Sequence, residues 1–85
     1  MKKQISTKQL FAEIAGWYGT LAILTAYALV SFHVISGDDL LFQLLNATGA
    51  LGIIVIALYK KLVQSIVLNV VWVIVAVIAI INIFL

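Results

Sequence analysis

Three long apolar runs fill most of the chain, and short polar segments separate them. Residues 36–39 interrupt the pattern once, and a pair of lysines at residues 60–61 interrupts it again. Each run is about 20 residues long, so as a helix it would be about 30 Å long, which is the thickness of the bilayer hydrocarbon. The pattern therefore predicts three transmembrane helices.

Capping signals predict where the first two helices begin. Ser6 and Gln9 fit a capping box, so we expect the first helix to cover about residues 7–35. The acidic residues 38–39 offer a cap and a negative charge to the second helix, which we expect at about residues 40–59. In the first helix, Trp17 and Tyr18 are expected at headgroup level, as part of an aromatic belt.

The boundary between the second and third helices has no glycine or proline. An unbroken helix of about 45 residues would be about twice as long as a bilayer requires, so the pair Lys60–Lys61 is interpreted as a turn. The third helix then covers about residues 64–85. We predict an all-α membrane protein, a triple-helix bundle in a single transmembrane domain over residues 1–85.

The lysines predict how the helices are oriented. Lys2, Lys3 and Lys8 precede the first helix, residues 60–61 precede the third, and the intervening loop 36–39 carries only acidic charge. The positive-inside rule places the N-terminus in the cytoplasm and the C-terminus outside. The apolar run after the first lysines is long for a signal peptide, so we expect no cleavage.

Composition supports a lipid environment and excludes several functions. The chain is 66% hydrophobic and 9% charged, whereas globular domains carry about 25% charged residues. There is no cysteine and a single histidine, and the serines have no plausible base. We therefore expect no catalytic residues, no metal site, no cofactor and no enzymatic activity. The net charge of +2 comes from lysines that set orientation, so no nucleic-acid partner is expected.

Small residues recur every three or four positions in each predicted helix. This spacing is typical of membrane helices that approach one another closely. The residues predicted to mediate helix packing are Gly16, Gly19, Gly49, Gly52, Ala76 and Ala79.

A few polar and aromatic residues lie within or near the apolar runs. Asn46 and Asn69 can form hydrogen bonds between helices or line a solute path. Trp72 shares a face with Asn69 and can pack in the core or stack on a ligand. Glu13 is interpreted as a solvated residue rather than a proton site, and His33 as an outer interface residue.

The pairs Asn46/Gly49 and Asn69/Trp72 carry a resemblance that covers roughly residues 14–82. On these pairs the chain resembles a group of small bacterial three-helix membrane proteins, and distantly the semiSWEET half-transporters of the PQ-loop superfamily. The resemblance implies a bacterial inner-membrane protein that forms a parallel 3+3 homodimer, with a solute path on the twofold axis.

The resemblance also implies a substrate site, which this chain matches in part. The helix 3 asparagine of semiSWEETs corresponds to Asn69, whereas their helix 2 tryptophan falls near Ile56 unless Trp72 replaces it. The Pro-Gln hinge of the family is absent because the chain has no proline. Sugar transport is therefore not carried over directly.

Two functions follow as hypotheses. The first is a homodimeric half-transporter or channel for a small polar solute such as a sugar, with Asn69, Trp72 and Asn46 as substrate-binding residues. The alternative is a structural or accessory subunit whose small-residue faces pack against a second copy or a larger membrane protein.

Overall fold

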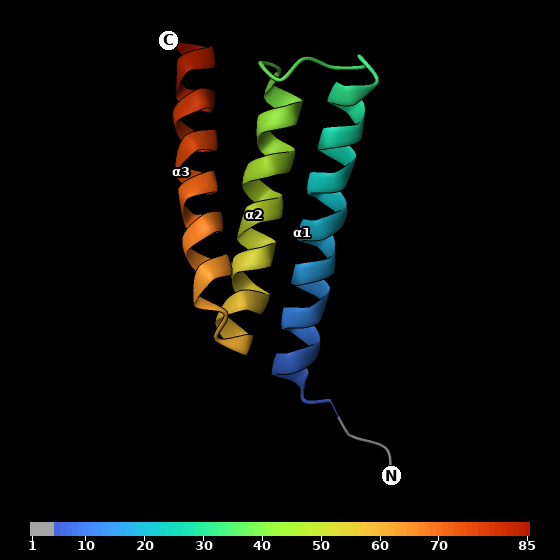
Figure 1. The fold of residues 1–85 in the computed structure, drawn as a ribbon, viewed down its shortest axis with the longest axis vertical. Helices are drawn as coiled ribbons and strands as arrows, with labels where there is room; N and C mark the ends of the chain where they lie inside the picture. The colour runs from blue at the N-terminus through green and yellow to red at the C-terminus, as the bar shows by residue number, and fades with distance from the viewer. Residues whose placement is uncertain (1–4) are drawn as a thin grey trace.

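Three antiparallel helices lie side by side in the computed structural model, which describes residues 5–85 (Figure 1). They are α1 (Thr7–Ser31), α2 (Leu40–Lys60) and α3 (Val63–Phe84). Helix α2 packs against both neighbours, whereas α1 and α3 make no contact within residues 5–85. All three are long and apolar enough to cross a membrane. The prediction of an all-α protein with three membrane-spanning helices packed as a bundle is confirmed.

The helix starts differ in how they are capped. Ser6 is the N-cap of α1, and its Oγ accepts a hydrogen bond of 3.1 Å from the backbone N–H of Gln9, as predicted. Asp39 is the N-cap residue of α2, but its side chain makes no capping hydrogen bond there. Its carboxylate instead accepts a bond of 3.0 Å from the backbone N–H of Ser36. The side chain of Asp39 therefore stabilises the loop rather than the helix end.

Helix α1 ends at Ser31, so the predicted end near residue 35 is wrong. The cause is His33, whose φ of 62° lies in the left-handed region and turns the chain out of the helix. The backbone N–H of Val34 then bonds back to the carbonyl of Leu29 at 2.9 Å. The apolar residues that follow belong to the loop, where hydropathy alone gives no sign of the turn.

The turn predicted at the lysine pair is present and very short. Lys61 adopts a left-handed conformation, with φ 58° and ψ 42°, and ends α2. The backbone N–H of Leu62 bonds to the carbonyl of Ala57 at 2.9 Å. Helix α3 begins at the next residue. Lys2 and Lys3, which contribute to the predicted orientation, lie outside the described residues.

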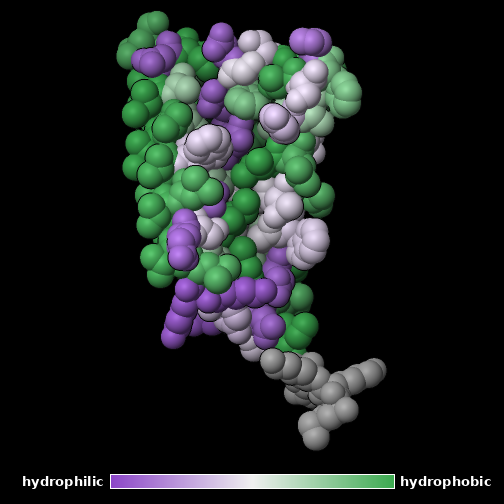
Figure 2. Space-filling view, in the orientation of Figure 1, coloured by the Kyte–Doolittle hydropathy of each residue, from purple (hydrophilic) through white to green (hydrophobic). Residues whose placement is uncertain are grey.

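The core consists of small side chains, and large apolar side chains face outward. Figure 2 shows the hydrophobic surface that results, especially along α3. Close approach through small residues is the usual way in which helices associate in lipid, where large apolar side chains gain nothing from burial. The buried residues are Ala12, Gly16, Gly19, Ala22 and Ala26 in α1, Asn46, Ala47, Gly49, Ala50, Gly52 and Ala57 in α2, and Asn69 and Ala76 in α3.

Candidate functional site

Four glycines form the contact between α1 and α2. A Cβ atom on Gly19 would overlap the carbonyl oxygen of Gly49 and lie 2.9 Å from the backbone nitrogen of Ile53. A Cβ atom on Gly52 would overlap the carbonyl oxygen of Ala15, and one on Gly16 would lie 2.7 Å from the side chain of Ile56. The two backbones therefore touch at this crossing, and no larger residue fits without moving them apart.

A hydrogen-bond relay also joins α1 to α2. The hydroxyl of Thr48 donates to the carbonyl of Leu44 at 2.8 Å. Its oxygen is therefore the acceptor for the hydroxyl of Tyr18, at 2.7 Å. Thr48 lies near the middle of α2, so the Tyr18 hydroxyl lies well inside the bundle and not near one of its ends. The placement of Tyr18 in an interfacial aromatic belt is wrong, because the hydroxyl finds its partner on the neighbouring helix.

An ion pair lies at the end of the α1/α2 interface where α2 ends in lysines. The Nζ atom of Lys60 lies 3.6 Å from Oε2 of Glu13, and both side chains are partly exposed. The sequence analysis interpreted Glu13 as a solvated residue, and in the structure it is partly exposed and pairs with the lysine at the end of α2. An exposed pair of this kind contributes at most about 1 kcal/mol.

The contact between α2 and α3 is built differently. Asn69 and Ala76, two turns apart, are the buried residues of α3. The side-chain amide of Asn69 donates to the carbonyl of Ser65 in its own helix at 2.9 Å. Within residues 5–85 Asn69 has no hydrogen bond to another helix. The face of α3 that carries Asn69 and Ala76 is therefore already covered by α2 in a single copy.

Asn46 is buried in α2 and is bonded in the same way. Its side-chain amide donates to the carbonyl of Phe42 at 3.1 Å. In the described part of the chain no donor from another helix reaches its side-chain oxygen. The interhelical hydrogen bond that we considered for both asparagines is therefore not formed within one copy.

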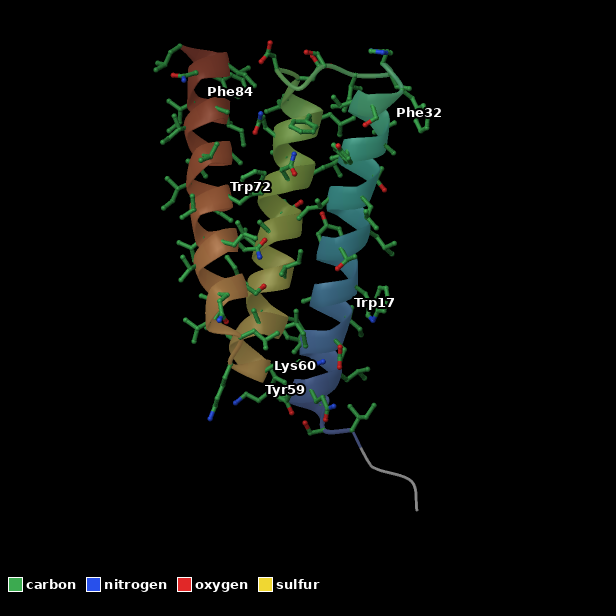
Figure 3. All side chains as sticks on the ribbon, viewed as in Figure 1. Trp17, Phe32, Tyr59, Lys60, Trp72 and Phe84 are labelled. Carbon is green, nitrogen blue, oxygen red and sulfur yellow. The ribbon has the colours of Figure 1, made fainter. Side chains whose placement is uncertain are left out.

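A cavity of about 130 Å³ lies between α2 and α3 and brings two of the three predicted substrate-binding residues together. Asn46 and Trp72 both line it, whereas Asn69 does not. Trp72 is 49% exposed and is not part of a closed core; Figure 3 labels it at the α2/α3 side of the molecule. The full lining is Phe42, Gln43, Asn46, Trp72, Val75 and Ala76.

Gln43 also lines this cavity, although it was not among the predicted substrate-binding residues. It lies three residues before Asn46 in α2, a spacing that places two side chains on one face and could have identified it. Its side-chain N–H donates to the carbonyl of Gly37 at 3.0 Å, which ties the start of α2 to the loop. Gln43 also borders a second cavity of about 290 Å³ at the end of the bundle that carries Asp38, together with Ala79 and Asn82.

The side chains that could bind a metal ion are not clustered in the described part of the chain. Within residues 5–85 no group of three or more His, Asp or Glu side chains could hold an ion. His33 is exposed in the loop after α1, and Glu13 lies at the opposite end of that helix. The polar groups that line the α2/α3 cavity are the neutral amides of Gln43 and Asn46 and the indole ring of Trp72.

Fold and site together define a small integral membrane protein with three spans. A protein-family model matches residues 12–85, so the chain belongs to that family. Comparisons with curated proteins and with solved structures found no match.

Proposed function

We propose that the chain is half of a homodimeric carrier or channel for a small, neutral polar solute, with the α2/α3 cavity as its half of the solute site. The observation that carries the proposal is the lining of that cavity. It places the amides of Gln43 and Asn46 beside the indole of Trp72. Polar groups at membrane depth usually face a cavity or a bundle interior.

The proposal of a second copy rests on the open arrangement of the helices. A cavity of about 280 Å³ lies on the α1 side of α2 and is lined in part by Trp17, Thr20 and Ile53. Ile53 follows Asn46 by two turns, so both cavities border one stripe of α2. Because α1 and α3 do not meet over that stripe, a second copy is needed to enclose a path. Figure 2 shows hydrophilic residues along the middle of one face, beside the hydrophobic margin over α3.

The size and charge of the cavity limit the solute class. Its volume of about 130 Å³ equals the liquid volume of about four water molecules. No lining residue carries a charge. We infer a solute of a few heavy atoms, or a larger one such as a sugar shared by the cavities of two copies.

We further propose that the chain lies in a bacterial inner membrane with its N-terminus in the cytoplasm. The support is the charge distribution. Lys8, Lys60 and Lys61 gather at one end of the bundle, and Asp38 and Asp39 lie in the loop at the other. The positive-inside rule assigns the lysine end to the cytoplasm.

The proposed site matches the substrate site of the semiSWEETs only in part. The position that would carry their helix 2 tryptophan, Ile56, packs against Gly16 of α1 and does not line the α2/α3 cavity. Trp72 of α3 instead supplies the ring that lines the cavity. The proposed site therefore uses Trp72 with Asn46, while Asn69 supports the α2/α3 contact.

Solute flux into proteoliposomes tests the proposal. We expect light-scattering traces to show uptake of glycerol, and a decreasing rate for erythritol and glucose as solute size rises. Asn46→Leu, which removes the amide at nearly constant volume, should abolish uptake while the copies remain associated. Asn69→Leu is the matched control and should retain most of the flux. Flux lost with Asn69→Leu and kept with Asn46→Leu would contradict the assignment of the site.

An accessory subunit is the second candidate, and one observation favours it. One of the two amide N–H groups of each asparagine already donates to a carbonyl of its own helix, which leaves fewer donors for a solute. If this candidate is correct, wild-type proteoliposomes should show no uptake above protein-free liposomes for any solute in the series. Asn46→Leu should then leave flux unchanged at background.

A further inference from the structure

A further cavity lies between α1 and α2, at the end of the bundle that carries Lys8 and Lys60. It has a volume of about 540 Å³ and does not share a lining residue with the α2/α3 cavity. Its lining residues are Lys8, Phe11 and Ala12 from α1, and Val55, Leu58 and Tyr59 from α2.

The polar and apolar groups of this cavity are separated along the membrane normal. Lys8 is the second residue of α1 and Tyr59 is the last but one of α2, so both lie at the same end of the bundle. Phe11 and Val55 lie about one turn deeper on their helices. The cavity therefore has a cationic, hydroxyl-bearing mouth at headgroup level and an apolar wall that extends toward the hydrocarbon.

The charge at the mouth is not neutralised by the protein. The chain has three acidic residues. Two of them, Asp38 and Asp39, lie in the loop at the opposite end, and the third, Glu13, pairs with Lys60 at 3.6 Å. Glu13 lines the cavity on the other side of the α1/α2 contact and not this one. Lys8 therefore faces the cavity as an uncompensated cation.

The geometry points to a binding site for one anionic phospholipid. The lipid phosphate would pair with Nζ of Lys8 and accept a hydrogen bond from the hydroxyl of Tyr59, and an acyl chain would lie along Phe11, Val55 and Leu58. Basic pockets between transmembrane helices on the cytoplasmic side bind anionic headgroups in this way. A free phosphate would leave the apolar wall unused, so the site is assigned to a lipid. The site does not depend on solute transport.

Native mass spectrometry of the full chain in mild detergent tests this site. Titration with phosphatidylglycerol should give one tightly bound lipid per chain, and phosphatidylcholine with the same acyl chains should bind weakly. Lys8→Gln should weaken phosphatidylglycerol binding about fivefold, the contribution of one lysine near an anionic surface. Lys8→Arg should restore binding, which shows that a loss in Lys8→Gln does not reflect misfolding. Tyr59→Phe should reduce affinity by a smaller factor.

Lys61→Gln is the matched control, because it removes the same charge from the same end of the bundle but lies outside the cavity lining. It should leave the affinity unchanged. Equal weakening by Lys61→Gln and Lys8→Gln would overturn the proposal in favour of diffuse surface attraction. Equal binding of phosphatidylcholine, or displacement of the lipid by millimolar inorganic phosphate, would also overturn it.

Discussion

The two faces of α2 make contacts of opposite character. Toward α1, glycine backbones touch, and a hydrogen bond and an ion pair add to the contact. Toward α3, alanines and asparagines pack, and within residues 5–85 no side-chain hydrogen bond or ion pair joins the two helices. A cavity remains between α2 and α3.

This difference assigns different roles to the two contacts: the α1/α2 contact holds the structure, and the α2/α3 contact contains the candidate site. Backbone contact at a glycine crossing fixes the distance and angle between two helices, because neither side has atoms that can move aside. Side-chain packing beside a cavity tolerates changes in volume more easily. We therefore expect α1 and α2 to form a rigid pair, and α3 to be the helix whose contact with α2 accommodates a solute.

Gly19→Ala should have the largest effect on stability. The added Cβ atom would overlap the backbone of α2, so the helices must separate. We expect the free energy of unfolding to fall by about 2 to 3 kcal/mol, typical of overpacking. Unfolding by sodium dodecyl sulfate in mixed micelles, followed by circular dichroism, measures the loss.

Gly37→Ala is the control for this change. Its Cβ would have no neighbour within 4 Å, and its φ is not in the left-handed region. Its stability should stay within about 0.5 kcal/mol of wild type. If Gly19→Ala proves as stable as Gly37→Ala, the α1/α2 contact is looser than its geometry indicates.

Ala76→Leu, at the α2/α3 contact, should lower the free energy of unfolding less than Gly19→Ala does at the α1/α2 contact. Ala76 is only 3% exposed, but it borders the cavity, which offers room for the larger side chain. We expect a loss of about 1 kcal/mol, at the low end for overpacking, measured in the same mixed micelles. The filled cavity should also stop solute flux. A loss as large as that of Gly19→Ala would show that both interfaces are equally rigid.

Tyr18→Phe should have a smaller effect still. It removes the hydroxyl that donates to Thr48, and hydrogen bonds between membrane helices contribute about 0.6 kcal/mol on average. Tyr27→Phe is the matched control, because Tyr27 is exposed and makes no side-chain hydrogen bond among the described residues. Identical unfolding curves for the two variants would argue against the relay.

Glu13→Gln should have the smallest effect on stability. The ion pair with Lys60 is exposed to solvent on both sides, where screening limits its contribution to a few tenths of a kcal/mol. The difference from wild type should disappear in 1 M salt, because screening is then nearly complete. A difference that persists at high salt would indicate a role other than charge pairing.

The sequence was sufficient to predict the three helices and most of their ends. Long apolar runs, the Ser6 cap and the lysine turn are local signals, and each determines local backbone structure. The end of α1 was not predictable from hydropathy, because the left-handed residue His33 follows an apolar run that continues into the loop.

The arrangement of the helices was harder to predict than their number. Small residues recur on every helix, so periodicity alone does not show which helix lies in the middle. Helix α2 has small residues on two faces, with Gly49 and Gly52 toward α1 and Ala50 on a neighbouring face. That two-sided pattern is a signal of a central helix.

The candidate site was predicted only in part for a related reason. Asn46 and Trp72 meet because the link between α2 and α3 is two residues long and sets their register. Asn69 was predicted as a third substrate-binding residue, and the same register places it outside the cavity lining. Contacts between helices depend on this register, which no local motif specifies.

Cysteine crosslinking in membranes tests most directly whether the side of the bundle that carries the α2/α3 cavity contacts a second copy. The chain has no native cysteine, so single substitutions report without background. Val75 lines the cavity and is 55% exposed, whereas Val77, two residues on, is 43% exposed and points to the opposite side of α3. If two copies enclose the cavity, Val75→Cys should form disulfide-linked dimers and Val77→Cys should form few. Crosslinking of Val77→Cys alone, or of neither variant, would contradict a solute path between two copies.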